Sequence, residues 1–320
     1  MIDKKTVFVL GAGASKPYGF PTGLELKIQI TENFTGILDK VRQSGDPFSA
    51  NLQPPAQVKQ FVDRFREADT NSIDLFLSRH RTVESIVSLG KLAISVIILE
   101  REWNSQFNLG LHDKFDQDWL NYLLTRMTST MRTEEVLNFS SNDVSFISFN
   151  YDRSLENYLH QSLTHSFPSE YTETLENELK ELRIVHIHGS LALLPWQDSD
   201  GGRVLPYPKE RAKAQVLVES AKNIRVVGES EDHADIAEAR GLLGTAEEIY
   251  FLGFGFAEEN ILTLDIPSSI NPSARIYGTV KGFVGTEISS IKNQFAGLSQ
   301  RHGKFDLLDV DSKRLLKEFL

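Results

Sequence analysis

Two glycine-rich stretches and three polar side chains in this sequence are of the types that bind phosphate groups and transfer protons. The stretch GAGAS spans residues 11–15 and the stretch GFG spans residues 253–255, each after an apolar run. Asn150 and Asp152 follow a third apolar run, and His188 follows a fourth. Glycine lets backbone N–H groups approach a pyrophosphate, and an imidazole with a pKa of about 6.5 can act as a general base at neutral pH. These residue types predict a site for a phosphorylated ligand with His188 as a base.

The first glycine stretch matches only part of the dinucleotide-binding pattern G-x-G-x-x-G. Gly11 and Gly13 occupy the first two positions, but Lys16 stands where the third glycine would be. No acidic residue ends a clear second strand about 20 residues later, as the full pattern requires. A tight structural turn is therefore a second interpretation of the same residues.

The apolar runs that precede these residues predict short, buried β-strands. Predicted strands span residues 6–10, 144–149, 182–187, 248–254 and 275–280, with a last one at 305–310. Apolar residues at helical spacing predict helices at 22–43, 152–163 and 209–222. Strands that alternate with helices favour an α/β fold, a parallel sheet with helices on both faces. Because ligands bind beyond the carboxyl ends of such strands, we expect the four segments to converge on one cleft.

A long helical block separates the first predicted strand from the second. Residues 58–139 show helical spacing with no strand among them, whereas the Pro- and Gly-rich segments 45–57 and 195–208 are predicted loops. We therefore expect one catalytic unit over residues 1–320. Within it, residues 1–24 and 140–320 form the sheet-bearing part, and residues 25–139 form a large helical insertion.

The composition limits the compartment and the partners of the protein. The 320 residues carry a formal net charge of −10, which disfavours direct binding to nucleic acid or anionic lipid. The sequence has no cysteine, so disulfides, cysteine-bound zinc and a cysteine nucleophile are excluded. The most apolar stretch is too short to cross a bilayer, and the first residues do not resemble a cleaved signal. We expect a cytoplasmic protein that does not bind membranes.

The same segments resemble the motifs of the sirtuin family. Sirtuins carry Gly-Ala-Gly-x-Ser followed by Gly-Ile-Pro, and here GAGAS at 11–15 is followed by GFP at 19–21. The sirtuin stretch Thr-Gln-Asn-Ile-Asp is similar to SFNYD at 148–152, and the catalytic His-Gly pair is similar to residues 188–189. The later Gly-Thr-Ser loop resembles residues 253–255. The resemblance implies a Rossmann-like domain that binds NAD⁺ and cleaves its nicotinamide–ribose bond.

Two departures separate the chain from sirtuins that deacetylate proteins. Those enzymes continue after Gly-Ile-Pro into Phe-Arg, and they fold a small module around a zinc ion held by four cysteines; both features are missing here. The chain is closer to the bacterial sirtuin-like NAD hydrolases of antiphage defence, which also lack the zinc module. This resemblance implies NAD⁺ as substrate and no zinc. It also implies control by homo-oligomerisation through the helical insertion, or by a partner such as a HerA-type ATPase or a short Argonaute.

The resemblance and the residue types together assign a role to each predicted site residue. His188 would be the general base on water or on a ribose hydroxyl, Asn150 would hold the ribose and orient that water, and Asp152 would accept a hydrogen bond from the nicotinamide carboxamide. The residues expected to bind the rest of NAD⁺ are Gly11, Ala12, Gly13, Ser15, Pro21, Thr22, Gly253 and Gly255. The cationic pyridinium would leave without a general acid, through an oxocarbenium-like ribosyl cation. The predicted activity is NAD⁺ glycohydrolysis to nicotinamide and ADP-ribose.

Other interpretations of these residues stay open at this point. The protein could be a sirtuin-type deacylase or ADP-ribosyltransferase, or a sensor that binds NAD⁺ or ADP-ribose without chemistry. Asn150 could be a turn residue, and His186 with His188 could bind zinc, although a packed strand residue is expected at His186. Asp74 is expected to favour a helix N-terminus, with a role near the site as the alternative. The loop 195–208 could be a lid over the cleft or a plain surface loop.

Overall fold

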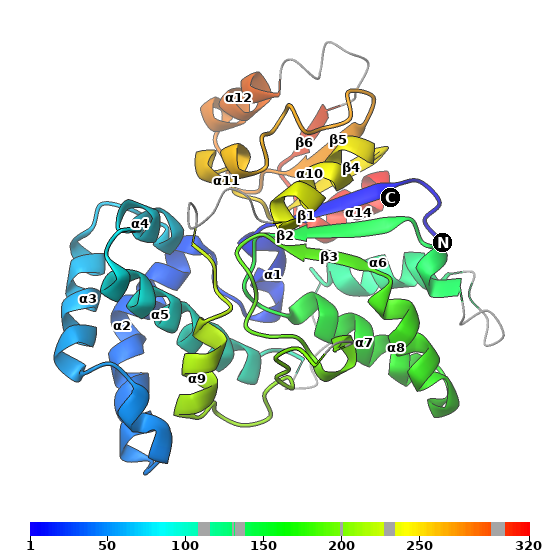
Figure 1. Cartoon of the computed structure of the whole chain (residues 1–320). Coiled ribbons are helices and arrows are strands. Elements are labelled where there is room, and N and C mark those ends of the chain that lie inside the picture. Colours follow the sequence, from blue (N-terminus) through cyan, green and yellow to red (C-terminus); the bar gives the residue numbers. More distant parts are fainter. Residues whose placement is uncertain (108–115, 130, 132–137, 199–200, 227–233, 296–304) are drawn as a thin grey trace.

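The strands of the described residues form a parallel sheet at the centre of the molecule. The structure is a computed structural model that describes residues 1–107, 116–129, 131, 138–198, 201–226, 234–295 and 305–320. The strands are β1 (Thr6–Leu10), β2 (Val144–Ser148), β3 (Arg183–His186), β4 (Glu248–Leu252), β5 (Arg275–Thr279) and β6 (Phe305–Leu308). Their order is β3-β2-β1-β4-β5-β6, and every neighbouring pair is parallel. The predicted α/β, Rossmann-like fold is confirmed (Figure 1).

Successive residues of the central strands face opposite sides of the sheet and enter different cores. In β1, Phe8 and Leu10 pack into one core, whereas Val7 and Val9 pack into the other. β2 and β4 alternate in the same way. Strands that are buried on both faces need apolar residues at nearly every position. This requirement explains why short uninterrupted apolar runs were sufficient to locate them in the sequence.

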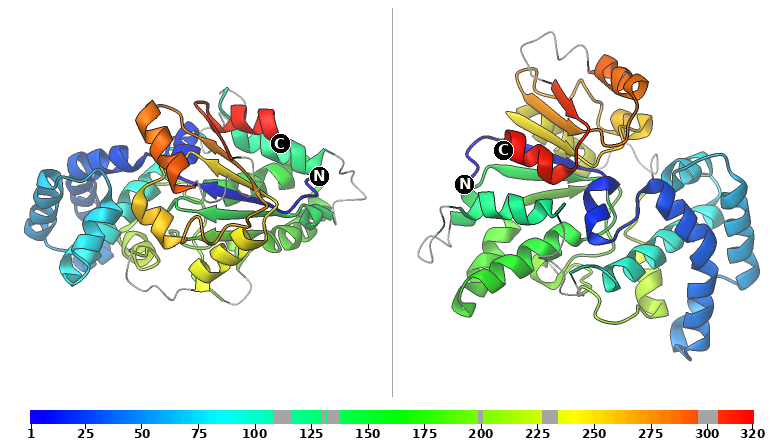
Figure 2. Two further views of the ribbon diagram at one scale, coloured as in Figure 1. Left: turned by 90° about the horizontal axis from the view of Figure 1, so that it is seen from above. Right: turned by 180° about the vertical axis from the view of Figure 1, so that it is seen from behind.

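Helices cover both faces of the sheet. The core on one face includes residues from α10 (Ala234–Thr245), α11 (Glu258–Thr263) and α12 (Gly285–Gln294). The core on the other face includes residues from α6 (Trp119–Thr128), α7 (Ser154–Ser166), α8 (Thr172–Lys180) and α14 (Ser312–Phe319). α6 and α14 pack side by side, as the view from behind in Figure 2 shows.

A group of helices, called here the helical lobe, projects from one side of the sheet (Figure 1). It consists of α2 (Gly23–Gln43), α3 (Pro55–Glu67), α4 (Ile73–Arg79), α5 (Glu84–Trp103) and α9 (Ala214–Ala221). α9 comes from the second half of the chain and packs on α5, where Ser95 Oγ donates to Leu217 O at 3.0 Å. The predicted block 25–139 therefore supplies helices both to the lobe and, through α6, to the layer beside the sheet.

Two of the predicted boundaries are wrong. α3 begins at Pro55, inside the predicted loop 45–57, because proline is well suited to the first turn of a helix. The predicted helix 209–222 is limited to α9, which begins only at Ala214. Residues 108–115, 130 and 132–137 of the predicted helical block lie outside the described residues. Within the described ranges, no helix has both the length and the apolar character needed to cross a membrane.

Candidate functional site

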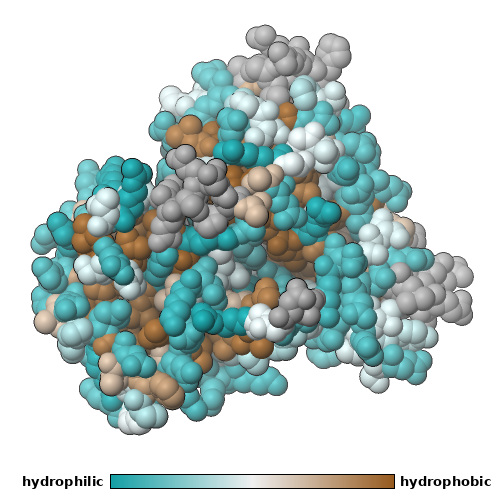
Figure 3. Space-filling view, in the orientation of Figure 1, coloured by the Kyte–Doolittle hydropathy of each residue, from teal (hydrophilic) through white to brown (hydrophobic). Residues whose placement is uncertain are grey.

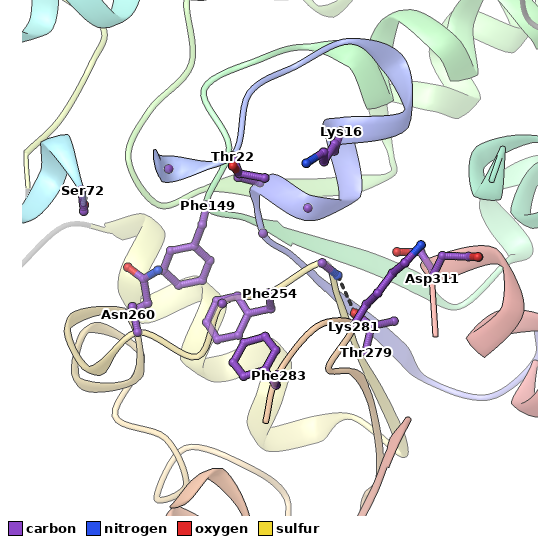
Figure 4. Close-up of a pocket in the computed structure, with 18 of the residues that line it drawn as sticks. Lys16, Thr22, Ser72, Phe149, Phe254, Asn260, Thr279, Lys281, Phe283 and Asp311 are labelled. Atoms are coloured by element: carbon purple, nitrogen blue, oxygen red, sulfur yellow. Dashed lines mark hydrogen bonds between the residues drawn. The ribbon is translucent and has the colours of Figure 1, made fainter. Parts of the chain in front are cut away.

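A cavity of about 870 Å³ lies at the carboxyl ends of the two central strands, β1 and β4. From β1 the chain continues through β2 and β3 toward one edge of the sheet, and from β4 it continues toward the other edge. Open α/β sheets bind ligands at such a reversal of strand order. The cavity walls come from the segments that follow the strands at this edge of the sheet and from the helical lobe, and Figure 4 shows 18 of the residues that line it.

The two glycine loops pack directly against each other. Gly13 N–H donates to Gly253 O at 3.0 Å, and Gly11 N–H donates to Leu252 O at 3.0 Å. A Cβ atom on Gly13 would lie 2.8 Å from Cα of Gly253, and a Cβ atom on Gly253 would lie 2.0 Å from N of Ala14. Gly253 also has a φ of +56°. Glycine is therefore required here by packing between the loops, whether or not a phosphate approaches them.

Side chains from distant segments hold the first glycine loop in place. Trp119 at the start of α6 donates from Nε1 to Ala14 O at 2.8 Å. Asn150, after β2, donates from Nδ2 to Gly11 O at 3.0 Å. The short helix α1 (Ala12–Ser15) is thus fixed by the layer of helices on one side and by the neighbouring strand on the other.

Ser15, Asn150 and Asp152 form a buried hydrogen-bonded group next to this loop. Asn150 Nδ2 also donates to Ser15 Oγ at 3.0 Å, and Ser15 Oγ donates to Asp152 Oδ1 at 3.2 Å. Asn150 Oδ1 is buried and has no hydrogen-bond partner among the described residues. Leaving a buried acceptor unpaired costs about 1–3 kcal/mol, so this oxygen is the atom of the group best suited to a buried water.

The carboxyl of Asp152 binds its proton more tightly than an ordinary aspartate does. Burial raises the pKa of Asp152 to about 6, although hydrogen bonds from Ser154 and Ser15 oppose the shift. The cause is desolvation, which disfavours the charged form of a carboxyl group. At neutral pH the folded protein therefore holds a negative charge that is largely shielded from water.

His188 reaches the cavity from the loop after β3. Its side chain lines the cavity although the residue is only 4% exposed. The centroid of its ring lies 5.5 Å from that of Phe149 and 6.0 Å from that of Tyr151. Arg225 N–H donates to His188 O at 2.9 Å and fixes the backbone. Among the described residues, no hydrogen bond engages the imidazole, so its nitrogens can serve a ligand.

His186 has a different environment from His188. Its Nδ1 lies 2.9 Å from Asn150 O, and its Nε2 lies 2.6 Å from Glu156 Oε1. Both partners only accept, so both nitrogens donate and the charged imidazolium is favoured. Burial lowers the pKa of His186, but the Glu156 charge and both hydrogen bonds raise it, and the pKa ends above its ordinary value. His186 is a packed residue that positions the backbone of Asn150.

The cavity has an aromatic wall, and its other side is lined by two lysines together with Asp311. The rings of Phe149 and Phe254 lie 5.2 Å apart, and Phe283 lies next to Phe254 in Figure 4. Lys16 and Lys281 also line the cavity, on the side away from Phe149. Aromatic faces suit a planar base, and ammonium groups suit phosphate oxygens. The lining is thus of the kind that a nucleotide requires.

No family model matches this sequence. No curated protein matches it either. The similarity to sirtuins therefore stays a resemblance of short motifs, and the geometry of the site carries the functional argument.

The structure divides the predicted site residues into two sets. Those that line the cavity are Gly11, Ala12, Gly13, Thr22, His188, Gly253 and Gly255. Those that do not line it are Ser15, Pro21, Asn150 and Asp152. The second set lies close behind the first glycine loop, and all four of its members are buried. His188 is thus the predicted catalytic residue with direct access to the cavity.

Sequence reasoning missed several residues of the cavity wall. Lys281 follows β5 at the same edge of the sheet as His188, so the rule that located His188 could also have found it. Lys16 was noted only as a departure from a glycine pattern, yet it lines the cavity and pairs with Glu25 at 2.8 Å. No sequence pattern marked Ser72 of the helical lobe as a cavity residue, because its position depends on how the lobe packs.

The loop 195–208 does not line the cavity in its described part. Trp196 and Tyr207 are buried in the core with the helices, and Tyr207 OH donates to Ser105 Oγ at 3.3 Å. The described part of this loop does not support the lid interpretation, because Trp196 stacks on His160 of α7 and Tyr207 is held at Ser105, beyond the end of α5. Among the described residues, no group of three or more His, Asp or Glu side chains is arranged to hold a metal ion.

Proposed function

We propose that the protein is an NAD⁺ glycohydrolase that releases nicotinamide and ADP-ribose. The observation that carries the proposal is a cavity at the reversal of strand order that combines the glycine loops, an aromatic wall, two lysines and His188, whose imidazole has no hydrogen bond among the described residues. Its volume of about 870 Å³ suits a ligand of dinucleotide size. The resemblance to sirtuin motifs supports the same ligand and the same bond.

The proposed reaction needs one base and one water. The bond between C1′ of the ribose and the pyridinium nitrogen breaks, and its electron pair leaves with nicotinamide, which becomes neutral. The oxygen of water forms a bond to C1′ of the oxocarbenium-like ribose. His188 accepts the proton that the water loses, an assistance typically worth about 10²- to 10⁴-fold in rate. Asn150 does not line the cavity and would act by holding the first glycine loop, through its hydrogen bonds to Gly11 O and Ser15 Oγ.

A role in bacterial antiphage defence by depletion of NAD⁺ rests on the resemblance alone. An unregulated NADase would harm its own cell, so we propose that assembly, with itself or with a partner protein, controls the activity. Figure 3 shows apolar surface among polar residues over the helical lobe, and Leu24 and Ile28 on α2 are 50% and 43% exposed. These features support the lobe as the contact surface.

A second candidate is a module that binds NAD⁺ or ADP-ribose without chemistry. It is favoured by the position of Asn150, whose side chain is tied to Gly11 O and Ser15 Oγ and does not line the cavity. In such a module Asn150 would serve only to hold the glycine loop.

Nicotinamide release distinguishes the two candidates. We expect concentrated purified protein to convert NAD⁺ to nicotinamide and ADP-ribose, as measured by chromatography over time. His188→Ala should retain NAD⁺ binding and lose turnover by about 10²-fold or more, because it lacks the base. Asn150→Ala should also lose turnover, and its NAD⁺ affinity is measured alongside as the check that the glycine loop is intact. NAD⁺ binding by native protein that releases no nicotinamide at any concentration would favour the binding module.

A further inference from the structure

Asp74 brings a negative charge from the helical lobe into the cavity. It lies in the first turn of α4 and lines the cavity together with Ser72. Tyr151 OH donates to Asp74 Oδ1, and Ser72 Oγ lies 3.4 Å from Asp74 Oδ2. A first-turn aspartate can be explained by the helix dipole alone. That explanation does not account for the bond to Tyr151, which belongs to the loop after β2.

Tyr151 also connects Asp74 to His188. The Tyr151 ring lies 6.0 Å from the His188 ring, and its hydroxyl holds Asp74. One side chain therefore separates the carboxylate from the proposed base. The bond to be cleaved must lie next to His188, so the base that leaves must lie in the same part of the cavity.

Asp74 is one of several charged residues that line the cavity. Lys16, Lys281, Glu259 and Asp311 also line it. Asp311 lies beside Lys281 in Figure 4, away from Ser72, whereas Glu259 precedes Asn260, which lies on the side of Phe149 and Ser72. The lysines suit the diphosphate, which places the adenosine half toward Asp311 and the nicotinamide half toward Asp74 and His188. Asp152, the residue that the sequence assigned to the carboxamide, does not line the cavity.

We propose that Asp74 binds the cationic nicotinamide ring of NAD⁺ and so selects the oxidised dinucleotide, an inference that rests on the proposed function. The carboxylate attracts the positive pyridinium and can accept a hydrogen bond from the carboxamide N–H. Tyr151 holds the carboxylate in place. The attraction ends when the bond breaks, because nicotinamide leaves as a neutral molecule. Asp74 is therefore a specificity residue that the helical lobe contributes to a site built on the sheet.

Calorimetric titrations with three ligands test this proposal. The protein carries His188→Ala to prevent turnover, and it is titrated with NAD⁺, NADH and ADP-ribose. NADH keeps the carboxamide without the positive charge, and ADP-ribose lacks the whole ring. Asp74→Asn should weaken NAD⁺ binding by about tenfold or more, NADH binding by less, and ADP-ribose binding by less than about twofold.

Two further variants serve as controls. Asp311→Asn removes a charge of the same sign from the other end of the cavity and should change the affinity for all three ligands by one common factor. Asp74→Glu keeps the charge and should retain the preference for NAD⁺ over NADH, which separates recognition from a loss of folding. Thermal unfolding of each variant is measured in parallel.

The outcomes separate this inference from the proposed function. Equal weakening of all three ligands by Asp74→Asn, or no change with any of them, would overturn the role of Asp74 and leave the NAD⁺ site in place. Absence of binding of every ligand to the protein with native Asp74 would overturn the proposed function, and this inference with it. A selective loss of NAD⁺ affinity supports both.

Discussion

At the scale of single residues, one buried group both fixes the glycine loop and carries an unfavourable charge. Its hydrogen bonds join Ser15, Asn150 and Asp152, and the charge is that of the Asp152 carboxylate. Asp152 is 5% exposed, and burial raises its pKa to about 6. An unfolded chain would ionise the same carboxyl near a pKa of about 3.9. The folded state therefore holds the proton over a pH range in which the unfolded state has lost it.

This difference predicts that Asp152→Asn stabilises the protein at neutral pH. The pKa of Asp152 is higher in the folded state than in the unfolded state, so ionisation of Asp152 lowers the free energy of unfolding. Above pH 6 this loss reaches about 3 kcal/mol at most. Asparagine keeps an acceptor for Ser15 and Ser154 without that charge. Urea denaturation should give Asp152→Asn a higher free energy of unfolding at pH 7.5. The advantage should shrink as the pH falls from about 6 to 4, and an advantage that does not depend on pH would contradict this account.

At the scale of elements, the contact between the loops after β1 and β4 decides where the cavity lies. Gly13 N–H bonds to Gly253 O, and neither residue has room for a Cβ atom. Gly255 differs from both, because a Cβ atom there would have no neighbour within 4 Å. The two glycines of the GFG stretch therefore differ in function. Gly253 is needed for packing between the loops, whereas Gly255 borders open space in the cavity.

Alanine substitutions separate these functions. Gly253→Ala should destabilise the fold by about 3 kcal/mol, since its Cβ would meet the Ala14 backbone and its φ of +56° disfavours a side chain. Gly255→Ala should leave the melting temperature almost unchanged. If Gly255 approaches the ligand, the same variant should weaken ADP-ribose binding. A stable Gly253→Ala, or an unstable Gly255→Ala, would disprove the packing argument.

At the scale of the whole molecule, a buried ion pair joins the helical lobe to the helices beside the sheet. Glu102 on α5 and Arg153 before α7 are both 0% exposed, and Arg153 Nη2 lies 2.5 Å from Glu102 Oε2. Arg153 Nη1 also donates to Leu205 O at 2.5 Å, which anchors the loop 195–208. The pair therefore ties α5, the start of α7 and the loop 195–208 together and links the lobe to the helices beside the sheet.

Removal of one charge of this pair should be strongly destabilising. Glu102→Gln leaves the Arg153 charge buried without its partner, which typically costs about 3–5 kcal/mol. Chemical denaturation would show a lower midpoint for this variant. Asp63→Asn, which breaks an exposed ion pair with Arg66 on α3, is the control and should leave the midpoint nearly unchanged. If Glu102→Gln and Asp63→Asn lowered the midpoint equally, the buried pair would not link the helical lobe to the helices beside the sheet.

The sequence located the strands because each is a short, mostly apolar run; β1, β2, β4 and β5 are largely buried, whereas the edge strands β3 and β6 are partly exposed. Thr6 to Leu10 were predicted as a strand, and β1 has those bounds. The cluster of site residues at one sheet edge also followed from the sequence, because parallel strands carry their carboxyl ends to the same side. His188 was placed correctly at that edge for this reason, and it lines the cavity.

The sequence by itself thus determined the α/β fold, the glycine loops and the edge at which the polar residues gather. Those features depend on local patterns of apolar residues and glycine. The tertiary structure decided which of the polar residues reach the cavity: Asn150 and Asp152 are buried behind the loop, whereas Asp74 and Lys281 line the wall. The physical reason is that exposure to a cavity depends on how segments far apart in the chain pack together, and no local pattern records that packing.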